Sequence, residues 1–89
     1  MLFYVRYRLK NEKLADLAEE VHSGKFPYKA KHVFASTEDP FVGLTIWEAN
    51  DQAGLDVILS KLKIFAEVLE VIPVVSAEYA QQRIFHELS

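Results

Sequence analysis

The chain contains no cysteine among its 89 residues. No disulfide can therefore stabilise it, and it has neither a thiolate metal site nor a thiol nucleophile. It also has no run approaching the roughly 20 apolar residues that a membrane-spanning helix needs. Glycine and proline are scarce, with three of each, so no linker or low-complexity tract divides the chain. We expect one domain over residues 1–89, stabilised by packing alone.

An excess of positive charge is missing as well. Ten Lys and Arg residues stand against thirteen Asp and Glu residues, for a net charge of −3. Nucleic-acid binding depends on clustered basic side chains, so we expect neither a nucleic-acid nor a membrane partner. Arg6 follows only a short apolar start, unlike the start of a signal peptide. We therefore expect a cytoplasmic protein.

Apolar residues, by contrast, are plentiful at 51% of the chain. A chain this short buries only about 60–65% of its unfolded surface, which makes a lone subunit marginal. A marginal core with ample apolar residues favours a second subunit that completes the burial.

The N-terminal half alternates between strand and helix patterns. Alternation over residues 2–9 predicts a strand with Phe3 and Val5 on one face and Tyr4 and Arg6 on the other. Asn11 is a suitable N-cap for a following helix, and Gly24 is suited to end it. The apolar stripe of this helix consists of Leu14, Leu17, Ala18 and Val21.

The rest of the chain repeats the pattern in the order strand, strand, helix, strand. Strands are predicted over residues 30–36, 41–49 and 67–75, with Pro73 at a sheet edge or a bulge. A helix capped by Asn50 or Asp51 lies between the last two strands, and a final helix follows Ser76. The fold class is therefore α+β: a ferredoxin-like βαββαβ sandwich with an extra C-terminal helix.

Two helices cover only one face of such a sheet. We predict a subunit core of Leu44, Ile46, Leu55, Ile58, Leu59, Leu62, Leu69 and Val71. The open face is predicted to carry Tyr4, Arg6, Arg8, His32, Phe34, Thr45, Trp47, Val68, Glu70 and Ile72. So large an apolar patch favours an isologous homodimer in which two open faces meet.

Residues 43–51 (Gly-Leu-Thr-Ile-Trp-Glu-Ala-Asn-Asp), residues 69–74 (Leu-Glu-Val-Ile-Pro-Val) and the Phe3/Val5 start carry a resemblance. Here the chain resembles an uncharacterised family of short proteins in the dimeric α/β-barrel superfamily. That family often has tryptophans in the second helix, where this chain has Ile58 and Leu62. More distantly, the chain is similar to muconolactone isomerases. The resemblance implies the fold and the dimer, but no catalytic residue can be carried over.

The candidate site lies on the open face. Glu70 is a candidate general base, Arg6 would orient an anionic substrate, and His32 is a third, weaker catalytic candidate. Tyr4, Phe34 and Trp47 would form the walls of a ligand pocket with them. The competing interpretation is a charged pair of Glu70 with Arg6 or Arg8 in a dimer interface. No spacing typical of a metal site or a cofactor motif occurs, so we expect neither.

Two hypotheses about function remain. The first is a homodimeric α/β-barrel module that binds a small apolar or aromatic anion between its sheets. The second is a small cofactor-free isomerase or monooxygenase-like enzyme that uses Glu70 with Arg6. No complete set of base, orienting group and electrophile is visible, which favours the first.

Overall fold

The computed structural model describes residues 1–88 and is built from four strands and three α-helices in that range. An α+β fold is therefore confirmed. The elements are, in chain order, β1 (Leu2–Leu9), the short 3-10 helix η1 (Asn11–Lys13), α1 (Leu14–Ser23), β2 (His32–Ala35), β3 (Val42–Glu48), α2 (Gln52–Phe65), β4 (Ala66–Val74) and α3 (Ala77–Leu88).

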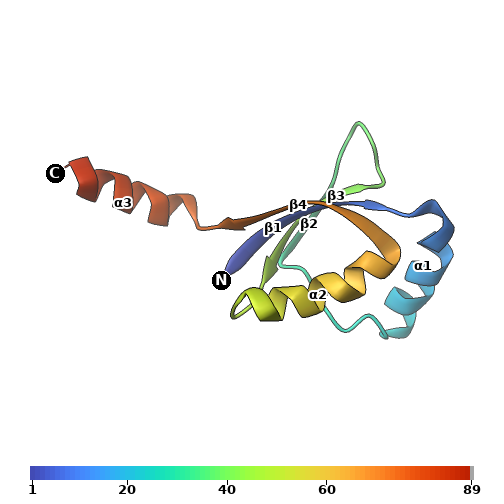
Figure 1. Cartoon of the computed structure of the whole chain (residues 1–89). Helices are drawn as coiled ribbons and strands as arrows, with labels where there is room; N and C mark the ends of the chain where they lie inside the picture. Colours follow the sequence, from blue (N-terminus) through green and yellow to red (C-terminus); the bar gives the residue numbers. More distant parts are fainter. Residues whose placement is uncertain (89) are drawn as a thin grey trace.

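The four strands form one antiparallel sheet in the order β2-β3-β1-β4. The two central strands are β3 and β1, so β2 and β4 form the edges. Figure 1 shows α1 and α2 on one side of the sheet and no helix on the other. This arrangement is compatible with a ferredoxin-like fold.

The helix ends follow from local chemistry. Asp51 caps α2, because its carboxylate accepts a hydrogen bond from the Gly54 amide at 2.8 Å. Gly24 ends α1 in the left-handed conformation with φ of 74°, as predicted. The predicted cap at Asn11 is wrong: η1 begins there, and Lys10 precedes it without a side-chain cap.

The core lies between the sheet and α2. Phe3 and Val5 of β1 face Trp47 and Thr45 of β3 across the ladder, and all four side chains are buried on the helix side. The apolar stripe of α2 packs against them as predicted, with Leu55, Ile58, Leu59, Leu62 and Phe65 buried.

The predicted faces of β3 are exchanged in the structure. Thr45 and Trp47 lie in the core, whereas Leu44 and Ile46 lie on the open face, opposite Arg6 and Tyr4. β3 is apolar on both faces, so alternation alone does not decide which face is buried. Gly43 decides it, because a Cβ at Gly43 would lie 2.5 Å from Cζ of Tyr7. The ring of Tyr7 fits on the helix side only above a glycine, and Thr45 and Trp47 share that face.

β4 also departs from the prediction. The register against β1 shifts between Arg6 and Tyr7, which leaves Leu69 as the extra residue of a β-bulge. Leu69 and Val71, predicted in the core, are exposed on this edge strand, while Val68, predicted on the open face, packs against the core. Pro73 lies on an edge strand, as predicted.

The predicted stripe of α1 is not buried. No α1 residue reaches full burial, and Val21 is exposed. α1 is instead connected to α2 by Lys61, whose ammonium lies 3.0 Å from the Glu20 carboxylate. The loop after α1 covers the core beside it, with the Phe26 ring 6.1 Å from the Phe65 ring.

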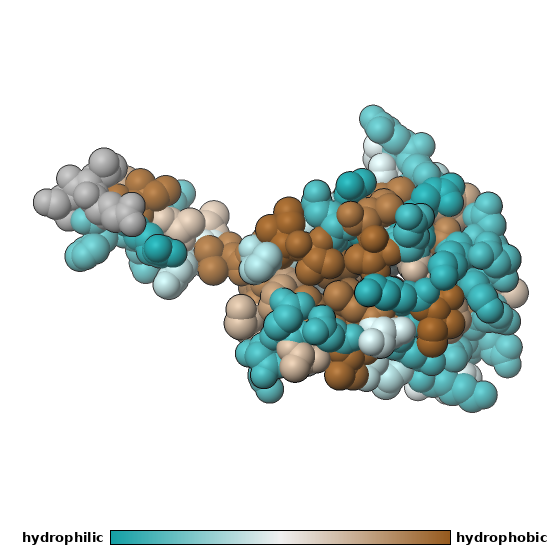
Figure 2. All heavy atoms as spheres, viewed as in Figure 1, coloured by the Kyte–Doolittle hydropathy of each residue, from teal (hydrophilic) through white to brown (hydrophobic). Residues whose placement is uncertain are grey.

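α3 is separated from the body of the molecule. Figure 1 shows it beyond the end of β4, pointing away from the sheet, α1 and α2. Ser76 caps it, since its hydroxyl accepts the amide of Tyr79 at 3.1 Å. The side chains of Ile84 and Phe85 are 54% and 67% exposed. Figure 2 shows hydrophobic atoms on the surface of the body and at its connection to α3.

Candidate functional site

The open face of the sheet is organised in rows that run across the four strands. Residues that face each other in an antiparallel ladder point to the same side. One row therefore consists of His32, Ile46, Tyr4 and Ile72, and the next consists of Phe34, Leu44, Arg6 and Glu70. Four of these eight side chains are purely apolar, namely Phe34, Leu44, Ile46 and Ile72. Tyr4 and His32 are aromatic with polar atoms, and Arg6 and Glu70 carry the charge.

Arg6 and Glu70 are brought together as predicted. They face each other across the β1–β4 ladder, next to the bulge at Leu69. Bulges often occur beside functional sites, because they redirect side chains. Arg6 is half-buried, and Glu70 is exposed. The ion pairs Arg8–Asp39, Lys31–Glu48 and Lys61–Glu20 include neither residue.

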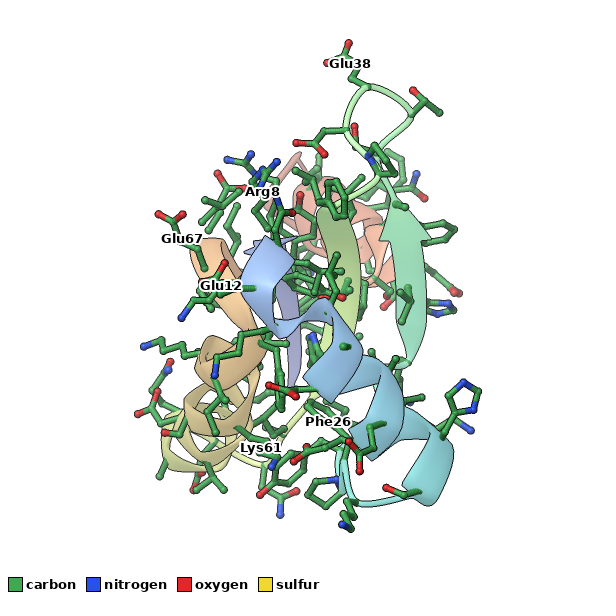
Figure 3. The ribbon with its side chains drawn as sticks, turned by 90° about the vertical axis from the view of Figure 1, so that its right-hand side faces the viewer. Arg8, Glu12, Phe26, Glu38, Lys61 and Glu67 are labelled. Carbon is green, nitrogen blue, oxygen red and sulfur yellow. The ribbon has the colours of Figure 1, made fainter. Side chains whose placement is uncertain are left out.

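Arg8 is occupied elsewhere and does not pair with Glu70. Its Nε donates to Oδ2 of Asp39 at 3.1 Å, and its guanidinium lies 5.5 Å from the centre of the Phe41 ring. These contacts hold Arg8 to the turn between β2 and β3, which projects beyond the sheet with Glu38 near its tip (Figure 3). Of the two candidate arginines, Arg6 is therefore the one beside Glu70.

His32 is separated from this pair. It lies on β2, at the opposite edge from β4, and its ring stacks on Phe34 with 6.5 Å between the centroids. Three strand spacings amount to about 14 Å, too far for a direct hydrogen bond between His32 and Glu70. The predicted candidates therefore do not form one catalytic cluster within the subunit.

Trp47 is not part of the open face, contrary to the prediction. Its side chain is 5% exposed in the core, and its indole N–H donates to the Thr45 hydroxyl at 2.8 Å. That hydroxyl in turn donates to the carbonyl of Val5 at 2.7 Å. The indole N–H of Trp47 thus has its acceptor on the helix side of the sheet. Trp47 therefore cannot form a wall of a pocket on the open face. The wall residues that remain from the prediction are Tyr4 and Phe34.

Two titratable groups near the sheet have shifted pKa values. Burial raises the pKa of Tyr7 above its ordinary value of 10.0. The hydrogen bond from Lys31, and then its positive charge, lowers the pKa of the exposed Glu48 carboxyl. The Lys31 ammonium lies 2.7 Å from that carboxylate, which connects the start of β2 to the end of β3. Neither group belongs to the Arg6–Glu70 pair.

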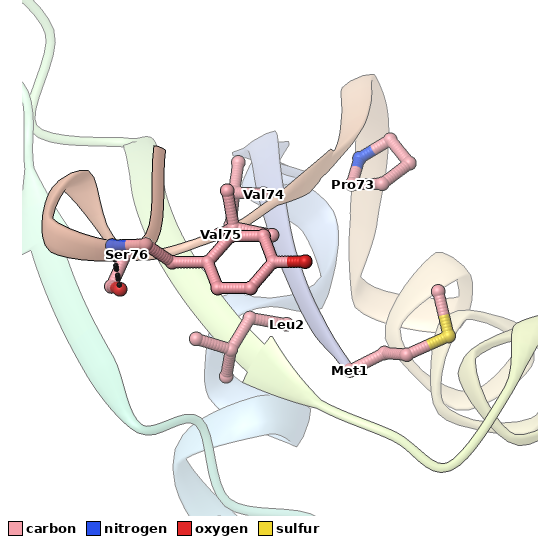
Figure 4. Close-up of a pocket in the computed structure, with 7 residues that line it drawn as sticks. Met1, Leu2, Pro73, Val74, Val75 and Ser76 are labelled. Carbon is pink, nitrogen blue, oxygen red and sulfur yellow. Dashed lines mark hydrogen bonds between the residues drawn. The ribbon is translucent and has the colours of Figure 1, made fainter. Parts of the chain in front are cut away.

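An apolar hollow lies at the end of the open face where α3 departs. It has a volume of about 510 Å³, within the range of small-molecule sites. Leu2 and Val74, which face each other across the β1–β4 ladder, are two of its lining residues. The others are Met1, Pro73, Val75, Ser76 and Tyr79 (Figure 4). Sequence reasoning missed this hollow, although the apolar run before Ser76 was its signal.

Other kinds of site find no support in residues 1–88. This part of the chain contains no group of three or more His, Cys, Asp or Glu residues that could hold a metal ion. Within the same range, no helix is both long and apolar enough to cross a membrane.

Comparisons place the chain in no known group. No protein family, curated protein or solved structure matches it. The resemblance to the dimeric α/β-barrel superfamily therefore stays a prediction based on residues 43–51 and 69–74.

Proposed function

We propose that the chain is a homodimeric α/β-barrel module that binds a small apolar or aromatic anion between two facing sheets. The observation that carries the proposal is the position of Arg6. Its guanidinium belongs to a central strand, between Leu44 and Glu70 in its row, and the apolar Ile46 and Ile72 belong to the neighbouring row. A cation with aliphatic neighbours in both rows, on a face without a covering helix, is suited to an organic anion.

The dimer is supported by the composition of this face. Phe34 is 63% exposed, and Ile72 is also exposed, while Leu44 and Ile46 are only half-buried. With the corrected orientation of β3, the face gains these two aliphatic side chains and loses Thr45 and Trp47. Packing it against the same face of a second copy would remove the patch from water.

The ligand class follows from the groups that line the face. An arginine recognises a carboxylate through paired hydrogen bonds, and the rings of Tyr4 and Phe34 offer flat apolar contacts. The negative charge of the neighbouring Glu70 repels further negative charge. A ligand with a single negative charge is therefore favoured over a dianion. A monoanionic aromatic acid such as 2-hydroxybenzoate has the matching chemistry.

The alternative is a small cofactor-free isomerase or monooxygenase-like enzyme. It is favoured by the register that places Glu70 directly opposite Arg6, since a carboxylate base beside an orienting cation can move a proton on a bound anion. His32 would have to come from the partner subunit, because its own subunit places it at the far edge. In this case Glu70→Gln abolishes turnover while binding persists.

The proposal is tested by calorimetric titration of the protein with 2-hydroxybenzoate. Light scattering first establishes whether the wild type is a dimer. Arg6→Gln is expected to weaken binding about tenfold or more, because it removes a charge-assisted hydrogen bond. Lys63→Gln is the matched control, since it removes the same charge from the exposed surface of α2. Equal affinity of the Arg6 variant and the wild type would contradict the proposal.

A further inference from the structure

A second hollow, the α1 cavity, lies on the helix side of the sheet, beside the loop that joins α1 to β2. Its volume is about 290 Å³. Tyr7 and Trp47 line it from the sheet, Leu17 and Val21 from α1, and Phe26 from the loop. Figure 1 shows α1 and this loop on the same side of the sheet. The α1 cavity therefore lies within one subunit, on the side of the sheet opposite to the open face.

The α1 cavity accounts for the unburied stripe of α1. Leu17 and Val21 belong to that stripe and line the cavity, yet Leu17 is only half-buried and Val21 is 61% exposed. α2 has five buried residues, whereas α1 has none. A helix as short as α1 depends for its stability on the packing of its apolar side. The stripe of α1 thus faces a space that the chain itself fills only in part.

The Tyr7 hydroxyl is the polar group that the sheet brings to this cavity. The end of the Tyr7 ring lies over Gly43, since a Cβ there would be 2.8 Å from the hydroxyl oxygen. The ring therefore leans from β1 across β3 toward β2, whose Val33 also lines the cavity. Within residues 1–88 this hydroxyl makes no hydrogen bond, and burial raises its pKa, so it stays protonated at neutral pH. Tyr7 thus offers a ligand a half-buried hydrogen-bond donor.

The lining favours a neutral ligand over an ion. Among the described residues that line the cavity only Lys29 is charged, and it is exposed, so its ammonium can remain in water. An anion inside would lose its hydration without gaining a paired cation. Phe26, Tyr28 and Trp47 offer aromatic contacts instead. An engineered cavity of about 150 Å³ binds benzene, so a cavity of roughly twice that volume is suited to two fused rings.

We propose that the α1 cavity binds a small neutral aromatic ketone, with its rings against the stripe of α1 and its carbonyl oxygen accepting a hydrogen bond from Tyr7. A single well-placed polar group in an apolar site fixes the orientation of the ligand. Binding covers the apolar side chains of α1 and supplies the acceptor for the Tyr7 hydroxyl. The site is complete within one subunit, so it depends neither on the proposed homodimer nor on Arg6.

The first test is a calorimetric titration with 1-tetralone, a ketone with two fused rings. Tyr7→Phe keeps the ring and removes the hydroxyl, so it is expected to weaken binding about three- to tenfold, the usual effect of one hydrogen bond. Tetralin, which has the same rings without the carbonyl, is the matched control ligand and should bind both proteins equally. Equal affinity of the two proteins for 1-tetralone would overturn the role of the hydroxyl. A wild type that does not bind 1-tetralone would overturn the whole proposal.

The second test locates the ligand. Val21→Trp places a large side chain in the cavity and is expected to weaken 1-tetralone binding about tenfold or more. Ala15→Trp puts the same side chain on the opposite side of α1 and should leave the affinity unchanged. Circular dichroism confirms the fold of both variants. Equal affinity of the two would overturn the location.

A third measurement needs no substitution. Trp47 is the single tryptophan of the chain and lines the cavity, so the wild type has one indole N–H resonance. That resonance is expected to shift during titration with 1-tetralone in a nuclear magnetic resonance spectrum. A resonance that stays in place while the ligand binds would overturn the location in the α1 cavity.

This inference and the proposed function fail in different ways. Arg6→Gln should keep the affinity for 1-tetralone, and Tyr7→Phe should keep the affinity for 2-hydroxybenzoate. A loss of 1-tetralone binding in Arg6→Gln as large as in Val21→Trp would place the ketone on the open face and overturn the α1 site. Failure of 2-hydroxybenzoate to bind contradicts the proposed function alone.

Discussion

The Thr45 hydroxyl is the polar centre of the core. It accepts the indole N–H of Trp47 at 2.8 Å and donates to the Val5 carbonyl at 2.7 Å, and it is fully buried. Buried polar groups are costly when they are left without a partner. This one hydroxyl therefore holds the single tryptophan to the central strand.

Thr45→Val is expected to lower the free energy of unfolding by about 1–3 kcal/mol, because the substitution leaves the buried indole N–H of Trp47 without its acceptor. Chemical denaturation monitored by the fluorescence of Trp47 measures the loss. Thr37→Val, in the exposed turn after β2, is the control and should change stability little. A similar loss in both variants would show that the hydrogen-bonded chain contributes nothing specific.

Tyr7 makes stability depend on alkaline pH. Burial raises its pKa above 10.0, so the folded state keeps the proton longer than the unfolded state does. The folded state then binds more protons above pH 10, and stability falls as pH rises from 10 through the folded pKa. Below pH 10 the contribution of Tyr7 to the free energy of unfolding does not change with pH.

Tyr7→Phe is therefore expected to lose stability less steeply than the wild type above pH 10. Thermal unfolding from pH 8 to 11 measures the slope in each protein. Tyr79→Phe alters an exposed tyrosine and is the control. Identical slopes for the wild type and Tyr7→Phe would contradict the assignment.

At the scale of elements, α2 is the most completely specified part of the chain. It has a capping aspartate and five buried side chains on one side, and its outer surface mixes polar residues with the exposed Val57 and Ile64. α1 lacks such packing, and the loop aromatics Phe26 and Tyr28 cover the core next to it. Most of the helix contribution to core burial therefore comes from α2.

Asp51→Ala is expected to destabilise the protein by about 1 kcal/mol, the usual effect of losing an N-cap. Asp56→Ala removes an aspartate from the exposed surface of the same helix and should have a smaller effect. Urea denaturation of both variants measures the difference. Equal effects would mean that the cap is not the stabilising feature.

For the whole molecule, the decisive property is the sheet face that no helix covers. Arg6 and Glu70 lie there among aliphatic and aromatic side chains, and α3 leaves the body from the same end of the sheet as the hollow. The proposed homodimer follows from this layout. A second copy would cover this face.

Ile46→Lys is expected to convert a dimer into a folded monomer, because it places a charge in the centre of the uncovered face. Val57→Lys is the matched control, since it replaces an exposed β-branched residue on α2. Light scattering reports the mass, and circular dichroism reports the fold. A dimer that persists in Ile46→Lys would show that the interface lies elsewhere.

Much of the fold could be predicted from local patterns. The strand and helix order, the caps at Asp51 and Ser76, the end of α1 at Gly24 and the buried stripe of α2 all depend on residues within a few positions of one another. That Glu70 lies beside Arg6 followed from the strand order expected for this fold. These features need only the periodicity and the chemistry of short segments.

The tertiary structure decided what local patterns leave open. Both faces of β3 are apolar, so alternation does not decide its orientation. The contact between Gly43 and Tyr7, which are distant in the chain, decides it. Likewise, the bulge at Leu69 turned Val68 toward the core, and Arg8 pairs with Asp39 instead of Glu70. Sequence by itself determined which segments become strands and helices. Only packing between distant segments decided which side chains face the core and which form the open face.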